Sequence, residues 1–107
     1  MKYALILILL SSAAAAQPKL GDAERGKRMA DEICAECHNV VLAPEVERAD
    51  APRSFTAIAQ DPLYTRAAFK AFFSTPHIQM PDFIFTREQT DDLIAYFEDM
   101  RAKLRAE

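Results

Sequence analysis

The sequence predicts an all-α fold of about four helices, and three observations lead to this prediction. Near the C-terminus, apolar side chains recur at the spacing of one helix face: Leu93, Ile94, Tyr96, Phe97 and Met100. Prolines divide the preceding chain into short segments. No segment shows the alternation of apolar and polar residues that is typical of a half-buried strand. A chain of 107 residues suits one small domain with a limited core.

Four segments carry helix signals, and each begins at a residue that can cap a helix N-terminus. They span residues 22–33, 54–60, 65–74 and 86–103. The capping residues are Asp22, Ser54, Thr65 and Thr86. Thr86 has Gln89 three positions later, which is the pattern of a capping box. Pro76 and Pro81 predict a loop between the last two helices, because proline interrupts a regular helix.

The first predicted helix carries small residues on the face that it shares with Cys34. Ala30 and Gly26 precede Cys34 by four and eight positions. A glycine inside a helix costs up to about 1 kcal/mol relative to alanine unless something offsets that cost. A tolerated surface glycine is the alternative, but close packing of a second helix accounts for the residue better. We therefore expect another helix to approach at Gly26.

The only two cysteines lie in the run Cys34-Ala35-Glu36-Cys37-His38. Cys-x-x-Cys-His is the attachment signature of c-type haem, in which each thiol adds to one vinyl group of the porphyrin. A redox dithiol would lie beside a βαβ pattern, and a zinc site would need a second pair of ligands at short spacing. A structural disulfide is the third alternative. The sequence favours one covalently attached haem, held by Cys34 and Cys37, with His38 as the proximal iron ligand.

The second axial position of a haem iron can be taken by methionine, by histidine or by no residue. Met80 lies in the loop between two predicted helices, so it can reach the face of the ring opposite His38. Met29 and Met100 fall within predicted helices, where core packing explains them. His77 is the competitor in the same loop and would give bis-histidine iron. We expect Met80 to be the distal ligand.

Residues 1–16 have the pattern of a secretory signal peptide. Lys2 supplies a positive charge, and residues 4–10 form an apolar run that is too short to span a bilayer. Small residues follow, and the simplest cleavage site is after Ala16. An uncleaved anchor is the alternative. We expect one exported domain at residues 17–107, located in the periplasm, because c-type haem is attached outside the cytoplasm.

The charge balance excludes one class of partner. The chain has 13 Lys and Arg residues against 16 Asp and Glu residues, a net charge of −3, and no basic stripe. Nucleic-acid binding is therefore not expected. After the leader, no apolar stretch is long enough to cross a membrane. We expect a monomer.

With these features, residues 20–104 resemble a class I c-type cytochrome. The resemblance rests on the segments 21–27, 34–38, 51–59, 80–81 and 92–96. It implies the cytochrome c fold, in which the N- and C-terminal helices cross and the helices surround one haem. It also implies His/Met ligation and a proline carbonyl, here that of Pro52, which accepts a hydrogen bond from His38 and orients it.

The chain departs from the family pattern in three places. Ala51 stands where glycine usually precedes the proline, and Pro44 is a second candidate for the same role. No tryptophan is present to bond a haem propionate, a role that Tyr64 or Arg53 could take. The ring of lysines with which mitochondrial members dock acidic partners is also absent.

The resemblance implies one-electron transfer rather than enzyme catalysis. The partners would be an oxidase, reductase or dehydrogenase bound briefly through a small interface. Two alternatives stay open. Without ligation by Met80, five-coordinate iron could bind small gases or act as a peroxidase. The chain could also be the dedicated haem subunit of a larger periplasmic oxidoreductase. Carbon monoxide binding and co-purification would separate these alternatives.

Overall fold

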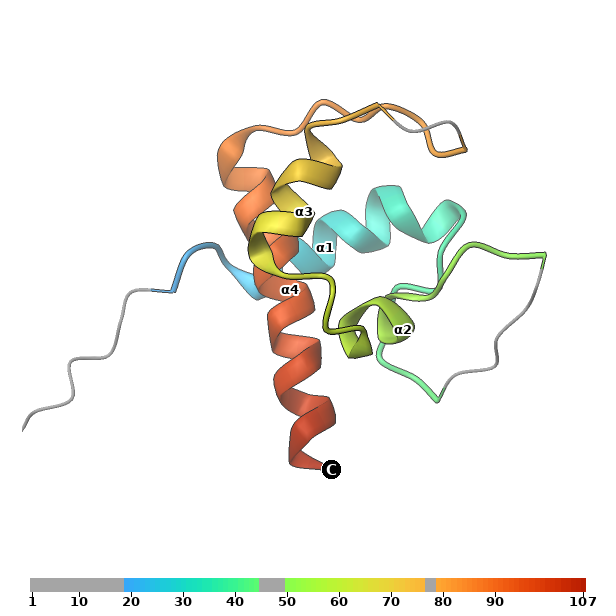
Figure 1. The fold of residues 1–107 in the computed structure, drawn as a ribbon, viewed down its shortest axis with the longest axis vertical. Coiled ribbons are helices and arrows are strands. Elements are labelled where there is room, and N and C mark those ends of the chain that lie inside the picture. Colours follow the sequence, from blue (N-terminus) through green and yellow to red (C-terminus); the bar gives the residue numbers. More distant parts are fainter. Residues whose placement is uncertain (1–18, 45–49, 77–78) are drawn as a thin grey trace, which may run out of the picture.

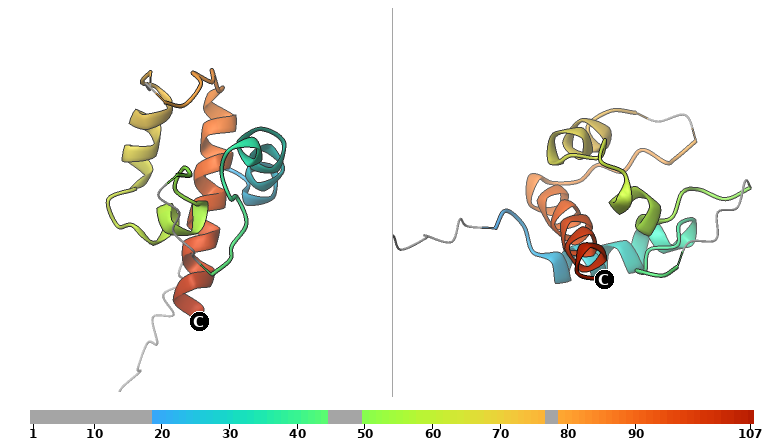
Figure 2. Two further views of the ribbon diagram at one scale, coloured as in Figure 1. Left: turned by 90° about the vertical axis from the view of Figure 1, so that its right-hand side faces the viewer. Right: turned by 60° about the horizontal axis from the view of Figure 1, so that its bottom comes forward.

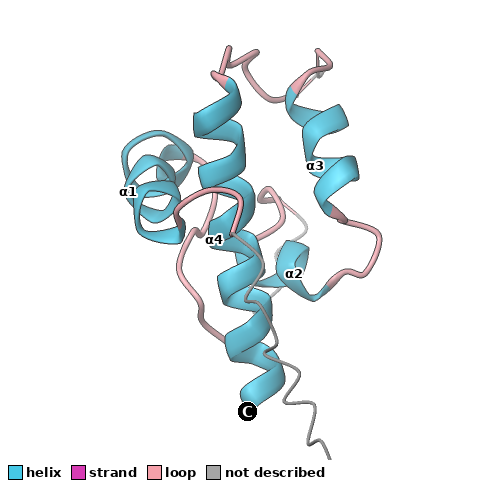
Figure 3. Cartoon of the chain, turned by 90° about the vertical axis from the view of Figure 1, so that its left-hand side faces the viewer, coloured by secondary structure: helices cyan, strands magenta, loops and turns pink. Residues whose placement is uncertain are grey.

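In a computed structural model, the described part of the chain comprises residues 19–44, 50–76 and 79–107. The predicted leader at residues 1–16 and His77 lie outside it. Four α-helices and one 3₁₀ helix follow in order: α1 (Ala23–Ile33), η1 (Cys34–Glu36), α2 (Phe55–Gln60), α3 (Arg66–Phe73) and α4 (Arg87–Ala106). None of these helices is long and apolar enough to cross a membrane. The described residues form only helices and loops, which confirms the predicted all-α fold (Figures 1 and 3).

The predicted caps form at all four α-helices. Each capping side chain accepts a hydrogen bond from the amide three residues later: Asp22, Ser54, Thr65 and Thr86. The capping box of α4 is complete, because the Thr86 amide also donates to the Gln89 side chain at 2.9 Å. α1 ends at Ile33 and tightens into η1, so the expected helical continuation at Cys34 is a 3₁₀ turn.

α1 crosses α4 at Gly26, as the sequence predicts. Gly26 and Ala30 are both buried on α1. A Cβ atom added at Gly26 would collide with the carbonyl oxygen of Asp92 and would lie 3.0 Å from the Cβ of Tyr96, both on α4. The left view of Figure 2 shows α1 nearly end-on beside the upright α4. The two helices therefore meet at backbone distance, where only a glycine fits.

A buried carboxylate joins the two helices at this crossing. Asp92 is 4% exposed. It accepts from the Asp22 amide at 2.7 Å and from the Nε and Nη2 atoms of Arg25 at 2.8 and 2.9 Å. The Arg25 hydrogen bond is the main reason why the pKa of Asp92 is lowered; burial opposes this effect and the Asp22 amide adds to it. The charged form of Asp92 therefore ties the start of α1 to α4.

The core lies between α4 and the three shorter helices. Its largest fully buried side chains all belong to α4: Leu93, Ile94 and Met100. Phe97 of α4 stacks on Phe69 of α3 with 4.4 Å between ring centroids, and it contacts Phe55 of α2 at 4.5 Å. The Tyr96 hydroxyl donates to the Val40 carbonyl at 2.7 Å. α4 is therefore the helix against which the other three pack.

Candidate haem site

The two cysteines lie on one tight turn at the end of α1. The amides of Cys37 and His38 both donate to the carbonyl of Cys34, at 3.2 and 2.9 Å. Both thiols are free. Cys34 is half-buried against the core, whereas Cys37 is exposed. This arrangement suits attachment of both sulfurs to one group that lies against the turn.

The environment of Cys34 differs from that of a redox dithiol. Burial raises the pKa of the Cys34 thiol to about 11. Reactive dithiols have the opposite property, a pKa lowered by nearby positive charge or by a helix N-terminus. Cys34 is therefore a neutral thiol at physiological pH. Within the described ranges, no three His, Cys, Asp or Glu side chains gather where they could hold a metal ion.

The imidazole of His38 is held through one of its two nitrogens. Nδ1 lies 2.8 Å from the carbonyl oxygen of Arg53. Because a carbonyl only accepts, Nδ1 carries the proton in this pair, and in the neutral ring Nε2 then keeps its lone pair. The ring also packs on Phe55 with 5.7 Å between centroids. This is the arrangement that orients a histidine for binding iron through Nε2.

The carbonyl that pairs with His38 belongs to Arg53, so the prediction that Pro52 accepts this hydrogen bond is wrong by one residue. Pro44, the other candidate, does not take the role either. The reason lies in how the chain enters α2. The Phe55 amide donates to the Asn39 carbonyl at 2.9 Å, which anchors this segment beside the residue after His38. The anchor brings the Arg53 carbonyl to the ring.

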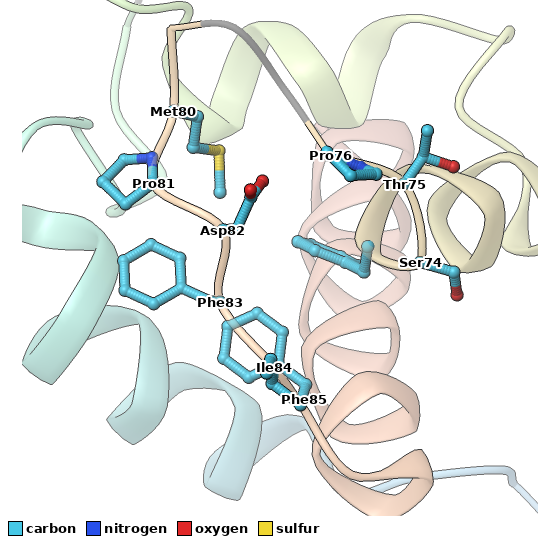
Figure 4. Close-up of a pocket in the computed structure, with 10 residues that line it drawn as sticks. Ser74, Thr75, Pro76, Met80, Pro81, Asp82, Phe83, Ile84 and Phe85 are labelled. Atoms are coloured by element: carbon cyan, nitrogen blue, oxygen red, sulfur yellow. The ribbon is translucent and has the colours of Figure 1, made fainter.

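The end of α3 and the Met80 loop that follows it line a cavity of about 320 Å³. The lining residues are Phe73, Ser74, Thr75, Pro76, Met80, Pro81, Asp82, Phe83, Ile84 and Phe85. Figure 4 shows the thioether of Met80 directed into this space, next to Asp82. Met80 is half-buried, and Ile84 is 99% exposed. The loop therefore presents a soft sulfur ligand and apolar side chains without a protein partner to cover them all.

The structure groups the predicted site residues in two places. Cys34, Cys37 and His38 share one turn, and Met80 lies apart from them on its own loop. Both segments extend on the same side of α4 in Figure 1. The donor set consists of two free thiols, an imidazole whose Nδ1 pairs with a carbonyl, and a thioether at the cavity of the Met80 loop. These residues fit a covalently held haem, and they define the chain as a small all-α haem c protein.

Comparison with known proteins makes this class more specific. Residues 23–101 match the cytochrome c family. Cytochrome c-552 of Bradyrhizobium diazoefficiens is 32% identical over 95 residues, which cover 89% of this chain and 90% of that protein. No solved structure gave a significant match. The chain belongs to the cytochrome c family, whose members are typically electron carriers rather than enzymes. Membership together with Cys34 and Cys37 implies covalent haem c.

Proposed function

We propose that this chain is a periplasmic one-electron carrier in which His38 and Met80 are the axial ligands of the haem iron. The observation that carries the proposal is the 2.8 Å pairing of His38 Nδ1 with the Arg53 carbonyl, directly after two free thiols. This pairing gives His38 the tautomer and the orientation that an iron ligand needs. The cavity at Met80, which Phe73, Phe83 and Phe85 help to line, supports a thioether as the second ligand.

Each residue has a distinct part in electron transfer. The bound haem would supply a centre that takes up and releases one electron. Cys34 and Cys37 tether it, and His38 donates through Nε2. The thioether of Met80 is a soft ligand that favours ferrous iron and raises the reduction potential. The apolar side chains of the Met80 loop would cover part of the haem, and the burial that they add would act in the same direction. No side chain has to attack or protonate a substrate, as expected of a carrier.

We further propose that residues 1–16 are removed during export and that residues 17–107 form the mature domain with one haem. Its partners would be an oxidase, reductase or dehydrogenase of the same compartment, bound briefly through a small interface. A net charge of −3 argues against steering by overall positive charge, so a local patch near the haem would guide docking. We expect the carrier to be a monomer without affinity for nucleic acid.

An optical spectrum of the matured protein tests the ligation. We expect sharp low-spin bands in the reduced form, no response to carbon monoxide, and a weak far-red sulfur-to-iron band in the oxidised form. Met80→Ala should lose the far-red band and should bind carbon monoxide. Met29→Ala is the matched control, because Met29 is half-buried on α1 and should leave the spectrum unchanged.

A high-spin spectrum that shifts at once with carbon monoxide in the unaltered protein would overturn ligation by Met80 and would favour a gas-binding protein or a peroxidase. Co-purification of a dehydrogenase or oxidase in fixed ratio would favour a haem subunit of a larger enzyme. Fractionation of cells and N-terminal sequencing test export, with Gln17 expected as the first residue of the mature chain.

A further inference from the structure

We propose that Arg53 is a positioning residue for His38. Its side chain donates hydrogen bonds to Asp61 and to the Ala57 carbonyl, and these contacts fix the main-chain carbonyl of Arg53, which accepts from the His38 imidazole. The contacts of the Arg53 side chain thereby set how strongly His38 donates to the haem iron. This inference rests on the proposed ligation by His38. It assigns a role in tuning the reduction potential to a side chain that need not touch the haem.

The Arg53 guanidinium is held at three points. Its Nη1 atom donates to Asp61 Oδ2 at 3.1 Å, and its Nη2 atom donates to the Ala57 carbonyl at 3.3 Å. Its central carbon lies 5.7 Å from the centroid of the Tyr64 ring, in a cation–π contact. The side chain is 47% exposed, so the ion pair alone contributes little to stability. The three contacts of the side chain together fix the geometry of the main chain at Arg53.

Asp61, which pairs with the Arg53 side chain, lies in a turn that is itself held in place by hydrogen bonds. The Leu63 amide donates to Asp61 Oδ1 at 3.0 Å. This bond first, and the Arg53 guanidinium second, hold the pKa of Asp61 below its ordinary value. Arg101 of α4 donates through Nε to the Ala59 carbonyl at 2.8 Å and through Nη2 to the Tyr64 carbonyl at 2.9 Å. Asp61 therefore sits in a turn that α4 holds on both sides.

The carbonyl of Arg53 needs such a support because of its position in the chain. Arg53 is exposed and lies outside any helix. It has no ring to restrict its φ angle, unlike the proline before it. On the far side of the peptide, the Ser54 side chain accepts from the Ala57 amide at 3.0 Å, and the Phe55 amide donates to the Asn39 carbonyl at 2.9 Å. The Arg53 side chain supplies the fixed point on the near side, and together these contacts hold the carbonyl toward His38.

The contacts of the Arg53 side chain have a predictable effect on the reduction potential of the iron. A well-aligned acceptor at Nδ1 raises the basicity of the imidazole and strengthens its donation through Nε2. Stronger donation favours ferric iron, so it lowers the reduction potential. Loss of the Arg53 side-chain contacts should therefore raise the reduction potential. A purely electrostatic role of Arg53 predicts the opposite, because the loss of a positive charge near the haem favours ferric iron. The sign of the shift separates the two mechanisms.

The test uses the matured haem protein and the variants Arg53→Gln, Asp61→Asn and the double variant. Arg66→Gln is the control, since Arg66 also pairs with carboxylates, on α4, but does not contact His38. Redox titration measures the potential, and proton NMR of the ferrous form measures exchange of the Nδ1 proton of His38 with solvent. We expect Arg53→Gln to raise the potential and to speed the exchange, and Asp61→Asn to speed it as well. The double variant should exchange no faster than Arg53→Gln, and Arg66→Gln should change neither quantity.

The outcomes are distinguishable. A lowered reduction potential in Arg53→Gln would overturn the inference, and so would exchange of the His38 Nδ1 proton as slow as in Arg66→Gln. The proposed function would still stand if the wild-type spectrum shows a haem ligated by His38 and Met80. A wild-type spectrum without a His-ligated haem would overturn the proposed function and this inference together. If Arg53→Gln does not fold, Asp61→Asn decides alone, because the loss of a surface charge by itself should not speed exchange of the Nδ1 proton.

Discussion

Replacement of Asp92 by asparagine keeps the size of the side chain but removes the charge that pairs with Arg25 at the crossing of α1 and α4. The amide oxygen of asparagine can still accept from the Asp22 amide. The two guanidinium bonds, at 2.8 and 2.9 Å, lose their charged acceptor. A hydrogen bond to a charged group contributes about 1.5–3 kcal/mol. Arg25 is half exposed, so water recovers part of this. We expect Asp92→Asn to lower the free energy of unfolding by about 2 kcal/mol.

The loss should depend on pH in a defined direction. Arg25 lowers the pKa of Asp92 in the folded protein, whereas the unfolded chain has the ordinary value of about 3.9. A group whose folded pKa is lowered contributes its stability above the unfolded pKa, and the contribution disappears as the pH falls through the folded pKa. The difference between wild type and Asp92→Asn should therefore be complete at about pH 5–7 and should shrink below about pH 4.

The assay is unfolding of the haem-containing protein by guanidinium chloride, followed by helical circular dichroism at several pH values. Asp31→Asn is the matched control, because Asp31 pairs with Lys27 at 2.7 Å on the exposed face of α1. Such an exposed pair should contribute little to the free energy of unfolding. The reasoning fails if Asp92→Asn is no more destabilising than Asp31→Asn, or if its effect is the same at pH 3 as at pH 7.

Three further changes test other parts of the structure. Gly26→Ala should destabilise the protein by about 2 kcal/mol in chemical denaturation, since overpacking against the α4 backbone outweighs the gain in helix propensity; an unchanged midpoint would contradict the crossing. Tyr96→Phe should cost about 1–2 kcal/mol in thermal melting, because the Val40 carbonyl loses its partner at 2.7 Å; a melting temperature equal to that of wild type would show that the bond is dispensable. The double variant Cys34→Ala, Cys37→Ala should be largely unfolded by circular dichroism, because it lacks the tethered haem; a native-like helical signal with cooperative melting would refute this.

Much of the fold could be predicted because its signals are local in the sequence. A capping residue satisfies an amide only three positions away, as at Thr86 and Gln89, so the four helix starts follow from short patterns. Gly26 was predictable for a similar reason, since an unsupported glycine inside a helix needs an explanation. The cysteines and His38 were identified by a motif whose spacing is set by the chemistry of attachment. The assignment of Met80 stays a prediction, and the optical spectrum tests it.

The features that sequence reasoning missed depend on residues brought together by the fold. Arg25 and Asp92 are 67 positions apart, and nothing in either neighbourhood indicates that they pair. The acceptor for His38 is the carbonyl of Arg53 and not that of Pro52, because the family pattern names a proline but not the register in which this segment lies against the imidazole. In an irregular segment that register depends on a distant anchor, here the bond from Phe55 to Asn39.

Different parts of the chain form the crossing of α1 and α4 and the candidate haem site, yet the stabilities of the two regions are coupled. At the crossing, Gly26 and Asp92 meet partners within the chain itself. On the loop side, apolar side chains stay open to water, with Ile84 99% and Phe83 36% exposed. Covering such surface is favourable, so a tethered haem would add its stability there. Because α2 and α3 pack on the same α4 that α1 crosses, weakening the loop side also removes support from the crossing. Loss of the tether should therefore affect the whole domain rather than the Met80 loop alone.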